Sequence, residues 1–201
     1  MRPLAKFATW TSIRSKQLIC SPFLSVWEHA LKTSDGHILD PYFLTKTHDF
    51  VLAVVIDSRD RVWLLDHYRP GIASVQREIP AGLIDGNENP EQTVVRELQE
   101  EIGYTGGQIY LTAQSYFDSS RQSGKCYSFL ALGGDITTEA YDEPGANFVP
   151  QVFTIPELLA DISSSSTSCA YPPVVIASIY YGIDYLKKLD NPQSRRLRTQ
   201  L

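Results

Sequence analysis

Three glutamates near the middle of the chain are the residues whose type and spacing point most directly to chemistry. Glu97, Glu100 and Glu101 stand at positions i, i+3 and i+4, and on a helix this spacing places them within roughly 100° of arc on one face. Carboxylates this close repel one another by about 0.2–0.5 kcal/mol per pair. A divalent cation such as Mg²⁺ offsets that repulsion, and proteins often hold Mg²⁺ with a few carboxylates and substrate phosphates. The pattern therefore predicts a metal site for phosphate chemistry, with a solvated acidic helix face as the alternative.

The loop that precedes these glutamates can bend tightly and still present oxygen atoms. Between Gly82 and Asn89 it holds two glycines and two acidic residues. One of these acidic residues, Glu88, can form an ion pair with Arg96. Such a pair would tie the loop to the segment that bears the glutamates.

That segment has the signals of a helix with defined ends. The sequence predicts a helix over Glu91–Ile102, with Asn89 as its N-cap, Pro90 at the first helical position and Gln92 completing a capping box. Gly103 suits the C-terminal cap. The apolar stripe of this helix consists of Val94, Leu98 and Ile102.

The elements around this helix are mostly strands. Phe50–Ile56 is a continuous apolar run rich in β-branched residues, which is typical of a strand buried on both faces. A polar turn over residues 57–60 connects it to a second strand, Arg61–Asp66, as in a hairpin. Further strands are expected at Ser25–Lys32, Ile38–Thr45, Gln108–Ser115 and Lys125–Leu132.

Two more helices are expected, over Pro156–Ile162 and Pro172–Leu189. Because strands dominate the first half and helices bracket the glutamate segment, the expected fold class is α+β, with a mixed sheet between helices. Residues 191–201 carry three arginines and no apolar periodicity. They are therefore expected to form a flexible basic tail.

Composition and charge exclude several classes of protein. The chain has 201 residues, of which 43% are hydrophobic and 20% charged, as in an ordinary globular protein. Its net charge of -5 argues against broad nucleic-acid binding, which needs a basic surface. No apolar run approaches the roughly 20 residues of a membrane-spanning helix, and the start lacks the apolar core of a signal peptide. The three cysteines are too few for a disulfide framework, so a cytoplasmic protein is expected.

The stretch from Gly82 to Tyr104 resembles the Nudix box at every position that the box specifies. The matching residues are Gly82, Glu88, Arg96, Glu97, Leu98, Glu100, Glu101, Gly103 and Tyr104. The resemblance implies a Nudix-type α/β/α sandwich with a mixed sheet. It implies hydrolysis, dependent on Mg²⁺ or Mn²⁺, of a nucleoside diphosphate linked to another group. The metal ligands that it implies are the carbonyl of Ala81 and the carboxylates of Glu97, Glu100 and Glu101. The catalytic residues that it implies are Arg96, Glu100, Glu101 and, from a late loop, Glu143.

The flanks of the box are similar to those of ADP-ribose and ADP-sugar pyrophosphatases. His67–Pro70 and Glu78–Ile84 match the segment before the box in that subgroup. Trp27 followed by Glu28 matches a base-stacking position in its N-terminal subdomain. The substrate contacts that this resemblance implies are Trp27, Glu28, Lys32, Arg69, Glu78 and Leu83.

The same resemblance implies a homodimer in which the N-terminal subdomains are exchanged between subunits. The expected organisation is a β-rich, dimerising subdomain over residues 1–48, a Nudix hydrolase domain over residues 49–190 and the basic tail over residues 191–201.

Two positions depart from the pattern of the subgroup. Relatives usually have a Pro-Gly pair after an acidic residue, where this chain has two serines after Asp118. Relatives also supply an acidic residue from a late loop, where direct alignment places Asn147 or Phe148, with Glu143 a few residues earlier. An asparagine cannot act as a general base. Either Glu143 reaches the site, a glutamate of the box serves instead, or activity is low.

The expected function is the cleavage of ADP-ribose to AMP and ribose 5-phosphate. The alternatives are another nucleoside diphosphate sugar or a dinucleotide as substrate, or a ligand-sensing module of the Nudix fold without useful catalysis. The complete set of glutamates favours the enzyme, because a module that binds no metal has no use for it. Neither a nucleic acid nor a membrane is expected as a partner.

Overall fold

The computed structural model describes residues 8–137, 148–164 and 170–201, and the chain divides into two compact units. One unit combines residues 1–48 with residues 116–124, and the other combines residues 49–115 with residues 125–201. The division between residues 48 and 49 falls where the sequence places a domain boundary. The return of residues 116–124 to the N-terminal unit was not anticipated.

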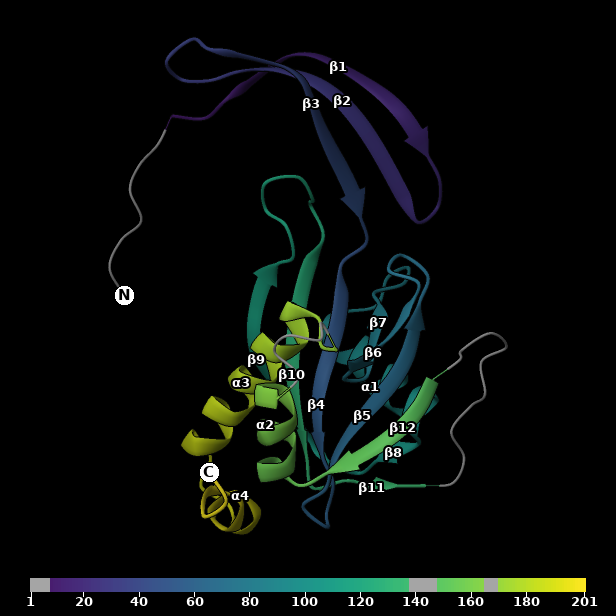
Figure 1. The fold of residues 1–201 in the computed structure, drawn as a ribbon, viewed down its shortest axis with the longest axis vertical. Coiled ribbons are helices and arrows are strands. Elements are labelled where there is room, and N and C mark those ends of the chain that lie inside the picture. Colours follow the sequence, from purple (N-terminus) through teal and green to yellow (C-terminus); the bar gives the residue numbers. More distant parts are fainter. Residues whose placement is uncertain (1–7, 138–147, 165–169) are drawn as a thin grey trace. The chain divides into compact units, whose positions relative to one another are not determined.

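The N-terminal unit is built on a three-stranded antiparallel sheet (Figure 1). Its strands, in the order in which they pair, are β1 (Thr11–Cys20), β2 (Leu24–Lys32) and β3 (Ile38–Thr47). Residues 116–124 lie against β3, where the hydroxyl of Tyr42 donates to the carbonyl of Ser120 at 2.7 Å. Within the three strands, all of which the structure describes, Ala30 is the only buried residue. This sheet therefore has almost no core of its own.

The second unit contains a mixed sheet with β4 at its centre. The strands follow the order β12-β5-β4-β10-β9, with β6 paired to β5 and β7 paired to β4. Strand β10 runs parallel to β4, whereas β5 and β7 run antiparallel to it. The bounds are β4 (Phe50–Ile56), β5 (Val62–Arg69), β6 (Ser74–Glu78), β7 (Ala81–Leu83), β9 (Gln108–Tyr116), β10 (Lys125–Leu132) and β12 (Phe148–Phe153). Two short strands, β8 (Tyr104–Thr105) and β11 (Asp135–Ile136), pair apart from this sheet.

Alternate residues of β4 serve two separate cores, because successive side chains of a strand point to opposite faces. Val51, Ala53 and Val55 pack with the buried stripe of α1 (Pro90–Ile102). Leu52, Val54 and Ile56 pack with residues of α2 (Ile155–Ser164) and α3 (Pro173–Lys188) on the other face. The result is an α/β/α sandwich (Figure 1), which confirms the expected fold class. The six β4 residues from Val51 to Ile56 are at most 2% exposed, as the apolar run predicts.

The expectation of a flexible basic tail was wrong. Residues 192–198 form a helix, α4 (Pro192–Arg198), that begins at Asn191 with a capping box completed by Ser194. Leu197 is completely buried in the core shared with α2 and α3. Arg196 forms an ion pair with Asp60 in the turn between β4 and β5. Leu197 is the apolar residue by which this helix of two turns packs on the core. One apolar residue forms no repeating pattern in the sequence, so apolar periodicity could not predict the helix.

No helix among the described residues is long and apolar enough to cross a membrane.

Candidate functional site

Helix α1, which bears the three glutamates, has both of its ends defined by local hydrogen bonds. The Asn89 side chain accepts from the Gln92 amide at 2.9 Å, and the Gln92 side chain accepts from the Asn89 amide at 3.0 Å. At the other end Gly103 has the left-handed conformation, with φ of 65°, that favours glycine in a C-terminal cap. The predicted capping box and C-cap are therefore confirmed. They set the position along α1 at which each glutamate lies.

Strand β7 brings backbone up to these glutamates. Ala81 and Gly82 pair with Leu52 and Val51 of β4, so β7 is held at the edge of the buried strand. The amide of Ala81 donates to Oε2 of Glu101 at 3.0 Å. A side chain at residue 82 would overlap the carboxyl group of Glu97. Gly82 thus leaves the space that the Glu97 side chain fills.

Arg96 joins the carboxylates of this helix to the preceding loop. Its Nη1 binds Oε1 of Glu97 and Oε2 of Glu100, each at 2.8 Å. Its Nε binds Oε1 of Glu88 at 3.1 Å, which confirms the ion pair expected between the loop and the helix. Hydrogen bonds from Arg96 and Thr93 lower the pKa of Glu88. One guanidinium therefore offsets part of the charge of three carboxylates.

Glu101 is the most strongly perturbed carboxyl group of the site. Burial raises its pKa to about 8, and the charges of Glu97 and Glu78 act in the same direction. The hydrogen bond from the Ala81 amide and the charge of Arg69 oppose this shift. A buried carboxyl group whose pKa lies this close to neutrality is common at sites that bind cations or transfer protons.

Arg69 and Glu78 form a two-pronged ion pair beside Glu101. Nε of Arg69 donates to Oε1 of Glu78 at 2.7 Å, and Nη2 of Arg69 binds Oε2 of Glu78. The Glu78 side chain is only 11% exposed, whereas the Arg69 side chain remains 43% exposed. The hydrogen bonds that Arg69 donates to Glu78, followed by the charges of Glu78 and Glu101, raise the pKa of Arg69 against the effect of burial. Both residues were predicted as substrate contacts, and in the structure Glu78 faces Arg69.

The donor atoms at this site fit a hard divalent cation. Glu97, Glu100, Glu101 and the Ala81 carbonyl offer oxygen only, which is the ligand type that Mg²⁺ and Mn²⁺ prefer. Among the described residues no three acidic, histidine or cysteine side chains already converge on one point. Arg96 contacts two of the carboxylates, Glu97 and Glu100.

Three other predicted residues, Trp27, Glu28 and Lys32, lie on β2 of the N-terminal unit. The Trp27 ring is partly buried, with its centroid 6.4 Å from the ring of His29, and Glu28 contacts Arg14 at 3.4 Å. Trp27 and Glu28 are adjacent in a strand, so their side chains point to opposite faces of the sheet. A base that lies on one face can therefore contact only one of the two side chains.

Glu143 and Asn147, the two residues considered for the late-loop acidic position, lie outside the described residues. Asp118, after which the sequence departs from the expected Pro-Gly pair, accepts from the amide of Ser120 at 3.1 Å in a turn. Leu83, the remaining predicted substrate contact, ends β7 and is 43% exposed.

Sequence reasoning missed the pairing of Arg69 with Glu78 and the contact between the Ala81 amide and Glu101. The first depends on the register of two strands, which is not evident from the sequence. In the hairpin of β5 and β6, Glu78 lies opposite Leu65, and Arg69 lies opposite Ser74. The even spacing between residues 65 and 69 places Arg69 and Glu78 on one face.

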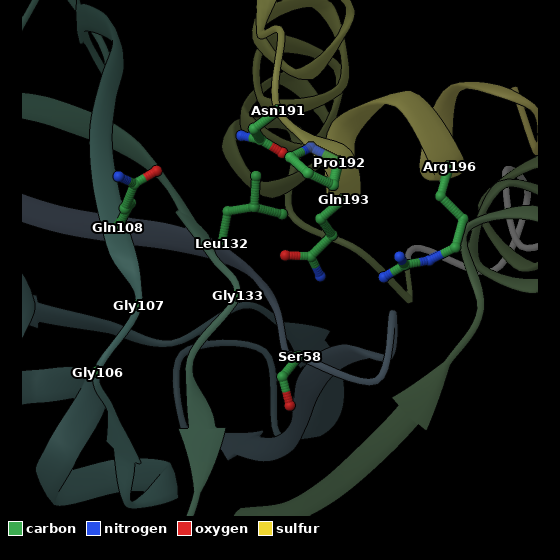
Figure 2. Close-up of a pocket in the computed structure, with 10 residues that line it drawn as sticks. All are labelled: Ser58, Gly106, Gly107, Gln108, Leu132, Gly133, Asn191, Pro192, Gln193 and Arg196. Atoms are coloured by element: carbon green, nitrogen blue, oxygen red, sulfur yellow. The ribbon is translucent and has the colours of Figure 1, made fainter.

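A hollow of about 390 Å³ lies elsewhere in the second unit (Figure 2). It is lined by Ser58, Gly106, Gly107, Gln108, Leu132, Gly133, Asn191, Pro192, Gln193 and Arg196. Ser58 follows the carboxyl end of β4 and Leu132 pairs with Ile56 there, whereas Gly82 pairs with Val51 near the amino end of β4. The hollow therefore contains none of the predicted site residues.

Comparison with known proteins adds independent evidence. The profile of the NUDIX domain matches residues 46–164, which is more than half of the chain. An uncharacterised Nudix hydrolase of Schizosaccharomyces pombe is 42% identical over 82 residues, 40% of each chain. The ADP-ribose pyrophosphatase of Saccharomyces cerevisiae is 35% identical over 82 residues, 40% of this chain and 33% of the yeast protein.

Two further comparisons cover more of the chain. The ADP-ribose pyrophosphatase of Bacillus subtilis is 24% identical over 147 residues, 73% of this chain and 76% of that protein. The crystal structure of an ADP compounds hydrolase superposes with a TM-score of 0.74 over 92% of this chain and 98% of its own, at 17% identity. This last likeness concerns the fold. The matches to the two fungal proteins span well under half of their length.

Proposed function

The chain belongs to the Nudix family, and from that membership we propose that it hydrolyses the diphosphate linkage of a nucleoside diphosphate sugar. ADP-ribose is the proposed substrate, with water added across one P–O–P bridge to give AMP and ribose 5-phosphate. The observation that carries the proposal is the contact of β7 with α1. There the Ala81 amide binds Glu101, and the absence of a side chain at Gly82 makes room for Glu97.

The proposed metal ligands are Glu97, Glu100, Glu101 and the Ala81 carbonyl, whose all-oxygen set fits Mg²⁺, with Mn²⁺ as a substitute. Such an ion supplies charge neutralisation at the diphosphate and lowers the pKa of a bound water. The chain's own residues do the positioning. Arg96 orients Glu97 and Glu100 through its two 2.8 Å contacts. Arg69 offers its guanidinium to the diphosphate oxygens.

Proton removal from the attacking water is assigned to a glutamate of the box. Oε2 of Glu101 accepts from the Ala81 amide, so Oε1 is the atom that would either bind the cation or hold the proton. Burial raises the pKa of Glu101 to about 8 in the metal-free chain, so at neutral pH this group holds a proton, and it would act as a base once a bound cation favours its carboxylate form. Glu100 and the late-loop Glu143 are the other candidates for this role.

Recognition of the nucleoside is proposed for the N-terminal unit. Trp27 would stack on the adenine, an interaction worth roughly 1–3 kcal/mol per base, or, with the substrate on the opposite face of β2, Glu28 and Lys32 would contact its polar groups. Leu83 would provide an apolar contact next to the diphosphate site, since 43% of it is exposed at the end of β7.

The N-terminal unit is also the proposed dimer interface. Its strands bury almost nothing by themselves. Large apolar side chains are exposed on it, namely Trp10, Ile13, Leu18, Ile19, Phe23, Ile38 and Phe43. Exposed apolar groups in this number are typical of a surface that a partner covers. A second copy of the chain is the proposed partner.

The test is turnover of purified protein with Mg²⁺ on ADP-ribose, ADP-glucose, GDP-mannose, UDP-glucose, NADH and a diadenosine polyphosphate, with chromatographic identification of the products. We expect AMP and ribose 5-phosphate from ADP-ribose, and loss of turnover with retained fold in Glu97→Gln. Cleavage of a different member would replace the substrate and keep the reaction. Binding of ADP-ribose without turnover would favour the ligand-sensing module instead.

A further inference from the structure

We propose that Glu78 is a positioning residue for Arg69. It binds the edge of the guanidinium formed by Nε and Nη2, so that the edge formed by Nη1 and Nη2 faces the substrate diphosphate. This inference rests on the proposed function. It departs from the sequence-based expectation that Glu78 itself touches the substrate.

The hairpin of β5 and β6 places both residues on the face that packs against α1. Leu65 lies opposite Glu78 in this hairpin, and Arg69 follows Leu65 by four residues on the same face. Leu65 belongs to the buried cluster that contains Val94 and Leu98 of α1. The ion pair of Arg69 with Glu78 therefore lies on the side of the sheet that carries the glutamate helix.

The hydrogen bonds show which edge of the guanidinium Glu78 uses. Oε1 of Glu78 accepts from Nε of Arg69 at 2.7 Å, and Oε2 binds Nη2. An arginine has five N–H groups in a rigid plane, and this side-on contact uses two of them. Both N–H groups of Nη1 and the second one of Nη2 remain. Within residues 8–137, 148–164 and 170–201, Nη1 of Arg69 has no hydrogen-bond partner. That remaining edge matches two oxygens of a phosphoryl group.

Burial gives Glu78 the rigidity that a positioning role needs. The Glu78 side chain is 11% exposed, whereas the Arg69 side chain is 43% exposed. A buried carboxylate that lost its partner would be strongly unfavourable, so Glu78 keeps the mobile arginine in one place.

Arg69 donates its hydrogen bonds to Glu78, and none joins it to Glu101 among the residues that the structure describes. The charge of Glu101 is close enough to Arg69 to affect its pKa. Without Glu78, the Arg69 guanidinium would be free to bind the Glu101 carboxylate, and both groups would then be lost to the reaction. The pair with Glu78 keeps the roles of Arg69 and Glu101 separate.

A double-mutant cycle tests this role. Calorimetry with Mg²⁺ would measure the affinity of the wild type, Arg69→Ala, Glu78→Gln and the double variant for ADP with a methylene group between its phosphorus atoms. We expect Glu78→Gln to weaken this affinity by about 10- to 100-fold, as for other groups that orient a ligand-binding side chain. In the Arg69→Ala background the same change should have almost no further effect, since Glu78 acts through Arg69. Independent, additive effects of the two substitutions would overturn the inference.

Asp66 provides the matched control. It forms the other two-pronged pair of this hairpin, with Oδ1 at 2.7 Å from Nε and Oδ2 at 3.0 Å from Nη2 of Arg77, on the opposite face. Asp66→Asn should lower stability but leave the affinity for the probe unchanged. An equal loss of affinity in Asp66→Asn would show that any break in the hairpin suffices, and would overturn the specific role of Glu78.

Arg69→Lys examines the same geometry if Glu78→Gln does not fold. Lysine keeps the charge but cannot be held side-on, so we expect roughly tenfold weaker probe binding, and unchanged binding would contradict the proposal. Wild-type turnover of ADP-ribose is measured separately. Absent turnover with intact coupling would reject the proposed function alone, and turnover with additive effects would reject this inference alone.

Discussion

Gly82 of β7 and the carboxyl group of Glu97 on α1 share a space that has room for only one side chain. A β-carbon at residue 82 would overlap the carboxyl carbon and Oε1 of Glu97. The flexible end of Glu97 can move away, so the backbone need not shift. Gly82 therefore controls where a predicted metal ligand lies, with little influence on the rest of the fold.

Gly82→Ala should consequently separate activity from stability. We expect turnover to fall by about 100-fold, because a displacement of about 1 Å in a positioned group has this effect. The free energy of unfolding should fall by at most about 1–3 kcal/mol, which is the usual cost of inserting an extra methyl group into a packed site. Steady-state kinetics and urea unfolding would measure the two quantities. Gly71→Ala is the control, since a side chain at Gly71 meets nothing within 4 Å, and it should leave both quantities unchanged.

Glu101 should make the metal-free protein less stable as the pH rises. Its pKa of about 8 in the folded chain lies above the ordinary value of 4.5. Between pH 4.5 and pH 8, the folded state therefore holds a proton that the unfolded state has lost. The free energy of unfolding therefore decreases from about pH 4.5 to about pH 8, by a few kcal/mol in total, and then levels off.

Urea unfolding in EDTA at pH 5 and pH 8 would measure this decrease. Glu101→Gln has no titrating group at this position, so the variant should be more stable than the wild type at pH 8. Addition of Mg²⁺ should stabilise the wild type at pH 8 but not Glu101→Gln to the same extent. A wild-type protein whose stability is the same at both pH values would contradict the raised pKa.

Arg96→Ala should reduce both stability and turnover, because Arg96 contacts Glu88, Glu97 and Glu100. We expect a loss of about 1–2 kcal/mol in the free energy of unfolding, a value reduced for partial solvent exposure. The control is Lys188→Ala, which breaks an exposed pair with Asp184 and should cost at most about 0.5 kcal/mol. Similar losses in the two variants would show that Arg96 is only a surface arginine.

Leu197→Ala tests the packing of α4. Leu197 is completely buried, and removal of such a side chain costs about 2–5 kcal/mol. Chemical denaturation would measure the loss. Leu201→Ala serves for comparison, because Leu201 is 42% exposed just beyond the helix, and it should change stability by less than about 0.5 kcal/mol. Equal, small effects would show that residues 191–201 behave as a tail in solution.

Elements with strong local signals were predictable from sequence. The bounds expected for the strands at residues 50–56 and 125–132 are those of β4 and β10. Exposure of a long apolar run to water is unfavourable, so such a run indicates a buried strand. The helix over residues 91–102 needed only the addition of Pro90, because its capping box and C-cap glycine act within a few residues. The pair between Glu88 and Arg96 was likewise predictable, since both lie in one short segment.

The sequence by itself determined which residues could act: the spacing of Glu97, Glu100 and Glu101 and the Nudix family pattern follow from the order of residues alone. Only the tertiary structure decided what surrounds them. The raised pKa of Glu101 depends on burial and on Glu78, and the pair of Glu78 with Arg69 depends on the register of two strands. The packing of Leu197 depends on which helices cover the sheet. Electrostatic and packing energies are set by distance and by access of water, and residues far apart in the chain acquire these only when the sheet and helices assemble.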